Sequence, residues 1–245
     1  MPPRGPQPSI GLQTTPFTKQ VLITLFGLYV GQLLIENWIG LPVIRIFGWH
    51  GAETGLFQPW QPITAYLLNG PSVMQAFFDW LVLFFFLPAV QNTLGKKGVI
   101  RLSLFVVATS AVLGFVLNQM GAVTQGGTGP FMGLNPLITA FIVVFGLTRP
   151  NAQILLFFVL PIRAAWIAWG TGLLAFLNFL AGRDLQSTLW LTGWLGAYFW
   201  LSRGEQGGKL LRKSVLRWKQ RKIQQRLQKF EVIPGGKDDD EPMVH

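Results

Sequence analysis

The sequence contains no cysteine, only two histidines and few charged residues. Without cysteine the chain cannot form a disulfide, a thiolate nucleophile or a thiolate metal site. Charged residues make up 12% of the 245 residues, which is about half the share of a typical soluble domain. Hydrophobic residues make up 50%. This composition predicts a protein that lies largely within a membrane.

Long apolar runs dominate what the sequence does contain. A helix needs about 20 residues to cross the hydrocarbon core of a bilayer. Five segments approach this length: residues 21–39, 73–94, 102–119, 164–180 and 185–201. A sixth, residues 136–148, is too short to cross alone and follows a glycine-rich stretch at residues 120–134. We predict an all-α, six-transmembrane-helix bundle whose fourth helix starts inside the membrane beside a cavity open to one side.

Basic residues are distributed unevenly around these segments. All but two of the 20 Lys and Arg residues fall on one side of the predicted helices, and the exceptions are Arg45 and Arg183. The positive-inside rule makes that side cytoplasmic. We therefore expect a multi-pass protein of the plasma or inner membrane with both termini in the cytoplasm. Placing Arg163 on this side requires residues 154–161 to be an interfacial segment.

The regions that flank the apolar part differ from it in composition. Residues 1–17 are rich in proline and glycine and are expected to be a flexible leader, and residues 18–203 form the transmembrane domain. Residues 204–231 have the pattern of a basic amphipathic helix, which predicts contact with anionic lipid rather than nucleic acid. A solvated helix or a protein-docking helix fits this pattern equally well. Residues 232–245 carry an acidic run and are expected to be disordered.

Short motifs between residues 57 and 203 resemble those of the rhomboid family of intramembrane proteases. Pro59, Trp60 and Thr64 are similar to the family's Pro-Trp-x-x-x-Thr segment before its second helix. Residues 133–136 stand where the family carries Gly-x-Ser-Gly with its nucleophile, and residues 190–196 where it carries Ala-His-x-Gly-Gly. The resemblance implies the six-helix rhomboid-like bundle.

The residues that perform catalysis in that family differ in this sequence. The resemblance places Asn135 at the position of the nucleophilic serine. It places Leu191 at the position of the histidine base, and a shift of one residue offers Trp190 or Thr192 instead. An amide is a poor nucleophile, and none of the three alternatives is a base. The resemblance therefore implies a rhomboid without its catalytic Ser and His, and we predict that the chain is not an enzyme.

Supporting positions have changed in the same direction. The family's His and Asn that help to hold the oxyanion correspond to Gln75 and Asp79, and an ionised carboxylate repels an oxyanion. The two histidines, His50 and His245, lie outside the predicted helices. Aspartyl proteolysis needs two carboxylates that share a proton, and Asp79 is the only acid well inside a predicted span. No metal-binding or phosphate-binding motif is present, so we predict no metal site and no cofactor.

The changed positions are the candidates for a binding site in the expected cavity: Gln75, Asp79, Gly133, Asn135 and Leu191. Asn135 followed by Pro136 also fits a helix N-cap with proline at the first helical position. Asp79 is either functional or merely tolerated through water or protonation. Gly193, Gly196 and Ala197 are small residues that are expected to let helices pack closely.

The leading hypothesis is a pseudoprotease that binds the transmembrane helices of other membrane proteins without cleaving them. Derlins and inactive rhomboids are the precedents that the resemblance implies. Two alternatives stay open. The chain is a constitutive structural subunit of a larger membrane complex, or it is a rhomboid-type serine protease that uses unconventional residues.

Overall fold

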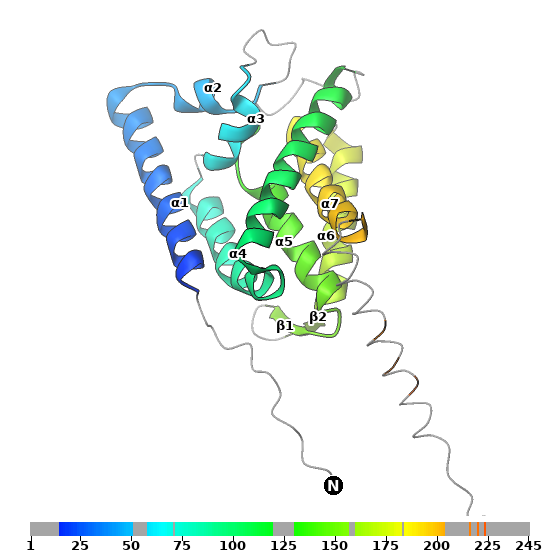
Figure 1. The fold of residues 1–245 in the computed structure, drawn as a ribbon. Helices are drawn as coiled ribbons and strands as arrows, with labels where there is room; N and C mark the ends of the chain where they lie inside the picture. The colour runs from blue at the N-terminus through cyan, green and yellow to red at the C-terminus, as the bar shows by residue number, and fades with distance from the viewer. Residues whose placement is uncertain are drawn as a thin grey trace, which may run out of the picture.

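The computed structural model describes residues 15–50, 58–70, 72–119, 130–156, 160–182 and 184–203, together with residues 216, 220 and 223. This part of the chain is mostly helical, with two short strands (Figure 1). The predicted acidic tail and all but the last three residues of the predicted leader lie outside the described residues. The same holds for most of the predicted basic helix and of the glycine-rich stretch.

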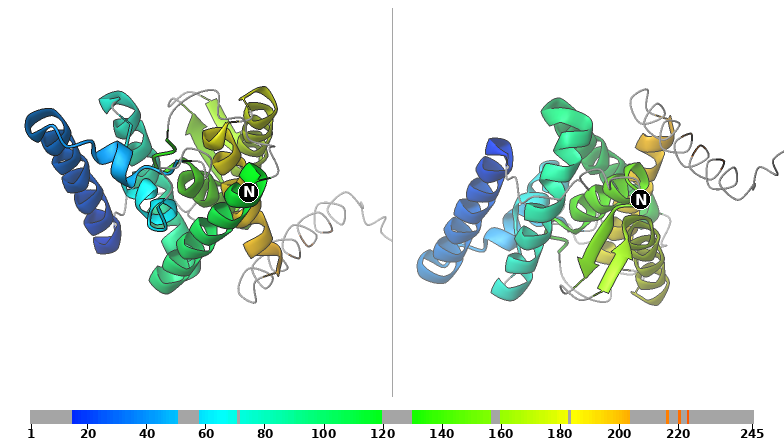
Figure 2. Two further views of the ribbon diagram at one scale, coloured as in Figure 1. Left: turned by 90° about the horizontal axis from the view of Figure 1, so that it is seen from above. Right: turned by 90° about the horizontal axis from the view of Figure 1, so that it is seen from below.

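Helix α1 (Pro16–Leu34) starts five residues before the predicted span. The Thr15 side chain caps it by accepting a hydrogen bond from the backbone N–H of Thr18 (3.2 Å), and Pro16 lies in the first turn, where a missing N–H costs nothing. A π-helical turn, η1 (Ile35–Ile39), extends the helix to Gly40, whose φ of 75° ends it. Figure 2 shows α1 at one edge of the molecule.

Short elements connect α1 to the next long helix: α2 (Val43–Phe47), α3 (Gln61–Thr64) and the 3₁₀ turn η3 (Ala65–Leu67). Trp49 and Phe131 tie this connection to the segment before α5. Their backbones exchange two hydrogen bonds of 3.0 and 2.9 Å, and their rings meet edge to face at 6.4 Å. Both side chains are almost fully buried.

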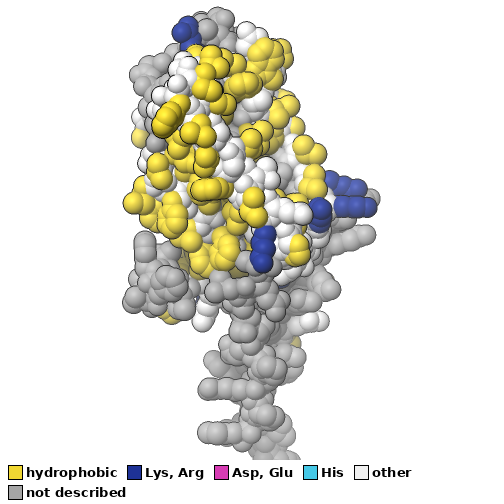
Figure 3. All heavy atoms as spheres, turned by 90° about the vertical axis from the view of Figure 1, so that its left-hand side faces the viewer, with side chains coloured by type: hydrophobic (Ala, Val, Ile, Leu, Met, Phe, Trp, Pro, Cys, Tyr) yellow, Lys and Arg dark blue, Asp and Glu magenta, His cyan; other side chains and the backbone are white. Residues whose placement is uncertain are grey.

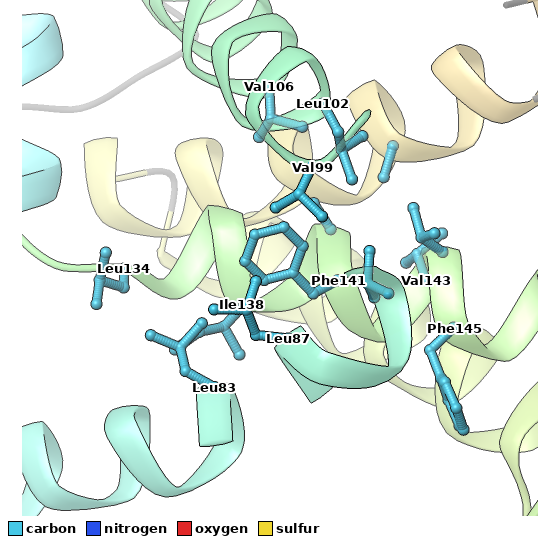
Figure 4. Close-up of a cluster of buried hydrophobic side chains, with 14 of the residues drawn as sticks. Leu83, Leu87, Val99, Leu102, Val106, Leu134, Ile138, Phe141, Val143 and Phe145 are labelled. Atoms are coloured by element: carbon cyan, nitrogen blue, oxygen red, sulfur yellow. The ribbon is translucent and has the colours of Figure 1, made fainter. Parts of the chain in front are cut away.

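Helix α4 (Val73–Gln119) consists of two arms. Gly95 has a φ of 73°, which a helix cannot contain, and Figure 1 shows the chain reversing direction there. The first arm (residues 73–94) and the second arm (residues 96–119) correspond to two of the predicted spans. Leu87 of the first arm and Val99 of the second pack in one buried cluster (Figure 4).

The remaining elements are α5 (Asn135–Thr148), β1 (Gln153–Leu156), β2 (Leu160–Arg163), α6 (Ala164–Gly182) and α7 (Leu185–Arg203). The strands form an antiparallel hairpin, which the sequence analysis missed by predicting an all-α fold with an interfacial segment at residues 154–161. The segment contains Ile, Phe and Val residues, which favour strands. Next to the Gln153–Arg163 pair, at the end of the hairpin opposite its turn, the Ala164 N–H donates a hydrogen bond to the Ala152 carbonyl (2.8 Å).

Among the described residues, three helical stretches are long and apolar enough to cross a membrane: Pro16–Ile39, Val73–Leu117 and Ala164–Gly182. The third is α6, and the second contains both arms of α4. Apolar side chains cover the outer face over α1, as a lipid-facing surface requires (Figure 3). Ile23 on this helix is 71% exposed. These features are those of a helical membrane protein.

Candidate functional site

The start of α5 is held in place by a turn at Gly133. This residue is buried and has a φ of 113°, and its N–H donates a hydrogen bond to the Ala65 carbonyl (3.0 Å). The predicted N-cap is wrong by one position. Asn135 is already helical, and Leu134 occupies the N-cap without a side-chain hydrogen bond. Because the Gly133 turn fixes the direction of the chain, helical geometry begins one residue earlier than the Asn-Pro pair alone suggests.

Helix α7 crosses α5 at Pro136, the second residue of α5. A Cβ atom added at Gly193 would lie 2.5 Å from the carbonyl oxygen of Pro136 and 2.6 Å from its Cα. Only glycine permits so close an approach of two helix backbones. A Cβ atom added at Gly196 would lie 2.7 Å from Thr109 Oγ1 on the second arm of α4, and Ala197 is fully buried. The three predicted packing residues thus lie where α7 meets its neighbours.

Leu191 lies away from this crossing. It shares a helical face with Leu195 and Tyr198, four and seven residues later, which are 44% and 41% exposed. Thr192, one of the two shifted-register alternatives, faces the second arm of α4 and donates a hydrogen bond to Ser110 Oγ (3.0 Å). The described contacts therefore join the start of α5 to Gly193 and not to Leu191.

Asp79 lies on the face of the first arm of α4 that is turned toward α5. It precedes Phe86 by seven residues, two helical turns on the same face, and the ring of Phe86 meets that of Phe145 in α5 at 5.5 Å. The first arm and α5 run in the same direction (Figure 1). From this contact, Asn135 lies about 15 Å back along α5 and Asp79 about 10 Å back along α4. Their depths thus differ by about one helical turn.

Packing at Leu83, one turn along α4 from Asp79, also keeps Asp79 and Asn135 within about one helical turn in depth. Leu83 of the first arm lies beside Leu134 and Ile138, which flank Asn135 in sequence (Figure 4). Asp79 itself is half-buried and makes no hydrogen bond or ion pair with the described residues. Gln75, one turn further out, is exposed. The structure therefore brings Asp79 and Asn135 to neighbouring helices, within about one helical turn of each other in depth.

A buried group of hydroxyls was not singled out by the sequence analysis. Tyr66, Ser110 and Thr192 are 3%, 0% and 2% exposed, and they come from η3, α4 and α7. Burial raises the pKa of Tyr66, and the nearby Ser110 hydroxyl opposes this increase only in part. The Tyr66 hydroxyl has no hydrogen bond of good geometry within the described part of the chain. The sequence signals this group only by Ser110 and Thr192, two small polar residues that lie in the apolar spans 102–119 and 185–201.

The described residues offer nothing that would hold a metal ion. No three His, Cys, Asp or Glu side chains of this part come together as a metal site requires. The polar groups near the start of α5 are one carboxylate and two amides, which can exchange hydrogen bonds or pair with one cation. The arrangement suits recognition of a polar group presented from within the membrane.

Comparison with known proteins adds no family to this description. No family model matches the chain, and no curated protein is similar to it in sequence. The rhomboid resemblance consequently rests on the short motifs alone.

The Tyr66 phenol predicts a loss of stability at alkaline pH. Because burial raises the pKa of Tyr66, the unfolded chain loses the phenolic proton near its ordinary value of about 10, whereas the folded chain retains it. The contribution to the free energy of unfolding is intact below about pH 10 and is lost as the pH rises further. Thermal unfolding in detergent from about pH 8 to pH 11 measures this decline. The decline is expected to be shallower in Tyr66→Phe, and an equal decline in both proteins would contradict the assignment.

Proposed function

We propose that the chain is a non-catalytic, rhomboid-like membrane protein that binds transmembrane helices of other proteins without cleaving them. The observation that carries the proposal is the position of Asn135 and Asp79. Asn135 opens a short helix, at the position where the resemblance would require a nucleophilic serine, and Asp79 lies on the adjacent face of α4. An amide and a carboxylate can recognise a polar group, whereas an amide is a poor nucleophile in the place of the serine.

The proposed bundle crosses the membrane six times. Its helices are α1, the two arms of α4, α5 with the segment before it, α6 and α7. The reversal at Gly95 supports the count, because it divides the Val73–Leu117 stretch into two crossings. Helix α5 has only 14 residues, and the Gly133 turn before it supports an irregular entry buried in protein.

The surroundings of His50 and Ser110 support a role without catalysis. His50 is buried in the segment between α1 and α4, called the outer connection, where its Nδ1 lies 3.0 Å from the Gly48 carbonyl oxygen. Ser110 of α4 is fully buried and accepts a hydrogen bond from Thr192 of α7. A protease with unconventional residues would need an exposed hydroxyl beside a base, and this hydroxyl is covered.

We propose that both termini are cytoplasmic. Seven described cations support this orientation, because they lie at the ends of elements that meet at the hairpin end of the bundle: Lys19, Lys96, Lys97, Arg101, Arg149, Arg163 and Arg203. Anionic lipid is the proposed partner of residues 204–231. Leu216 and Ile223 support an apolar face on this helix, since they are seven residues apart, helical and more than half exposed.

Purification from the native membrane in a mild detergent, followed by quantitative mass spectrometry, tests the proposal. Varied membrane proteins at substoichiometric amounts are the expected result for a protein that binds clients. A single set of partners at a constant ratio would instead establish a structural subunit. Labelling by a serine-directed fluorophosphonate would establish the protease alternative, and we expect none.

A further inference from the structure

Asp79 is an acidic residue in an apolar helix, and it has no partner within the described part of the chain. It makes no hydrogen bond or ion pair with any described residue. Lys96 and Lys97, the nearest described cations along α4, lie beyond Gly95, about 25 Å further along the helix. Arg45 is exposed on α2 and forms no described ion pair with Asp79. Ionisable residues at membrane depth are expensive, and they generally pair with another group or face water.

The surroundings of Asp79 have the pattern of a helix-docking face. The Asp79 face consists of Gln75, Phe78, Asp79, Val82 and Phe85, which recur at the spacing of one helical stripe. Phe78 and Phe85 are 53% and 46% exposed, and Gln75 is also exposed. The face borders α5 through Phe86. It is therefore an apolar stripe that carries one acid and one amide.

We infer that the helices bound at this face carry a lysine or arginine that pairs with Asp79. The inference rests on the proposed function and names the chemistry of the partner. Asp79 follows the start of α4 by six residues, so the cation belongs about 9 Å below the outer end of the bound helix. The long apolar stem of Lys or Arg can pack on Phe78 while its charge reaches the carboxylate. Gln75 can accept a further hydrogen bond from the same cation.

Designed peptides test the inference without knowledge of the natural partner. Three Leu-rich transmembrane peptides of about 20 residues differ at one position, about 9 Å below the outer end, which holds Lys, Leu or Asp. Association with the full-length protein in neutral lipid vesicles is measured by energy transfer between dyes. We expect the Lys peptide to bind about tenfold more tightly than the Leu peptide. The Asp peptide should bind more weakly than either.

Variants of Asp79 decide whether this preference arises from the proposed pair. In Asp79→Asn the Lys and Leu peptides should bind equally, whereas Asp79→Glu should keep the preference. Glu36→Gln is the matched control for loss of a carboxylate, because Glu36 is engaged by the Ile44 N–H (2.8 Å) in the outer connection, and it should leave the preference unchanged. Thermal unfolding verifies that each variant is folded.

The possible outcomes separate this inference from the proposed function. Equal binding of the Lys and Leu peptides to the wild type, or a Lys preference that survives in Asp79→Asn, would overturn the Asp79 pairing while leaving helix binding intact. Failure of all three peptides to bind would contradict helix binding itself. A Lys preference that is lost only in Asp79→Asn would support both.

Discussion

Replacement of Gly193 by alanine is expected to lower the free energy of unfolding by about 2–3 kcal/mol. The added methyl group would lie 2.5 Å from the carbonyl oxygen of Pro136. Because the obstacle is backbone, a change of rotamer cannot relieve it, and α5 and α7 must separate. The separation moves Asn135, so binding of transmembrane helices should weaken as well. Thermal or denaturant unfolding in detergent measures the change in stability.

Gly170→Ala is the matched control for this change. Gly170 also lies in a membrane helix, α6, but no atom outside its own helix lies within 4 Å of the position of an added Cβ. Alanine favours helices over glycine by about 1 kcal/mol, so the control should be unchanged or slightly more stable. If both variants lost stability equally, the close crossing of α5 and α7 at Gly193 would be refuted.

Replacement of Trp49 by alanine is expected to cost about 3–5 kcal/mol of stability. The indole is 2% exposed, lies against Gly114 of α4 and belongs to one buried cluster with Leu189 of α7. Its loss leaves a cavity and removes the edge-to-face contact that orients Phe131 before α5. Thermal unfolding in detergent measures the loss.

Trp38→Ala provides the comparison for Trp49→Ala. Trp38 is 85% exposed on η1, so its removal leaves no cavity and should change stability by less than about 0.5 kcal/mol. A Trp49→Ala protein as stable as Trp38→Ala would show that the outer connection is not anchored at this point.

Much of the helical framework could be predicted from the sequence, because the length of an apolar run determines where a membrane helix can form. The reversal at Gly95 follows from the same reasoning, since the run from residue 73 to residue 119 is too long for one crossing. The β1–β2 hairpin was missed because a short apolar run has no periodicity that separates a strand from an interfacial segment. Its pairing depends on the contact between Ala152 and Ala164, which only the structure shows.

The candidate site was harder to predict. The depth of Asp79 relative to Asn135 depends on how α4 and α5 pack, through Phe86 and Phe145. Leu191 shows how sensitive a helical site is to register, because a shift of one residue rotates a side chain by about 100°. Its neighbour Thr192 faces the buried Ser110, whereas Leu191 shares the outward face of Leu195.

Photocrosslinking in native membranes tests most directly the central claim that the Asp79 face binds helices without cutting them. A photoreactive phenylalanine analogue is placed at Phe78, within the Asp79 face, or at Ile23, which is 71% exposed on α1. The account predicts that full-length membrane proteins are captured through position 78 and far less through position 23. Equal capture at both positions, or capture of cleaved fragments, would contradict it.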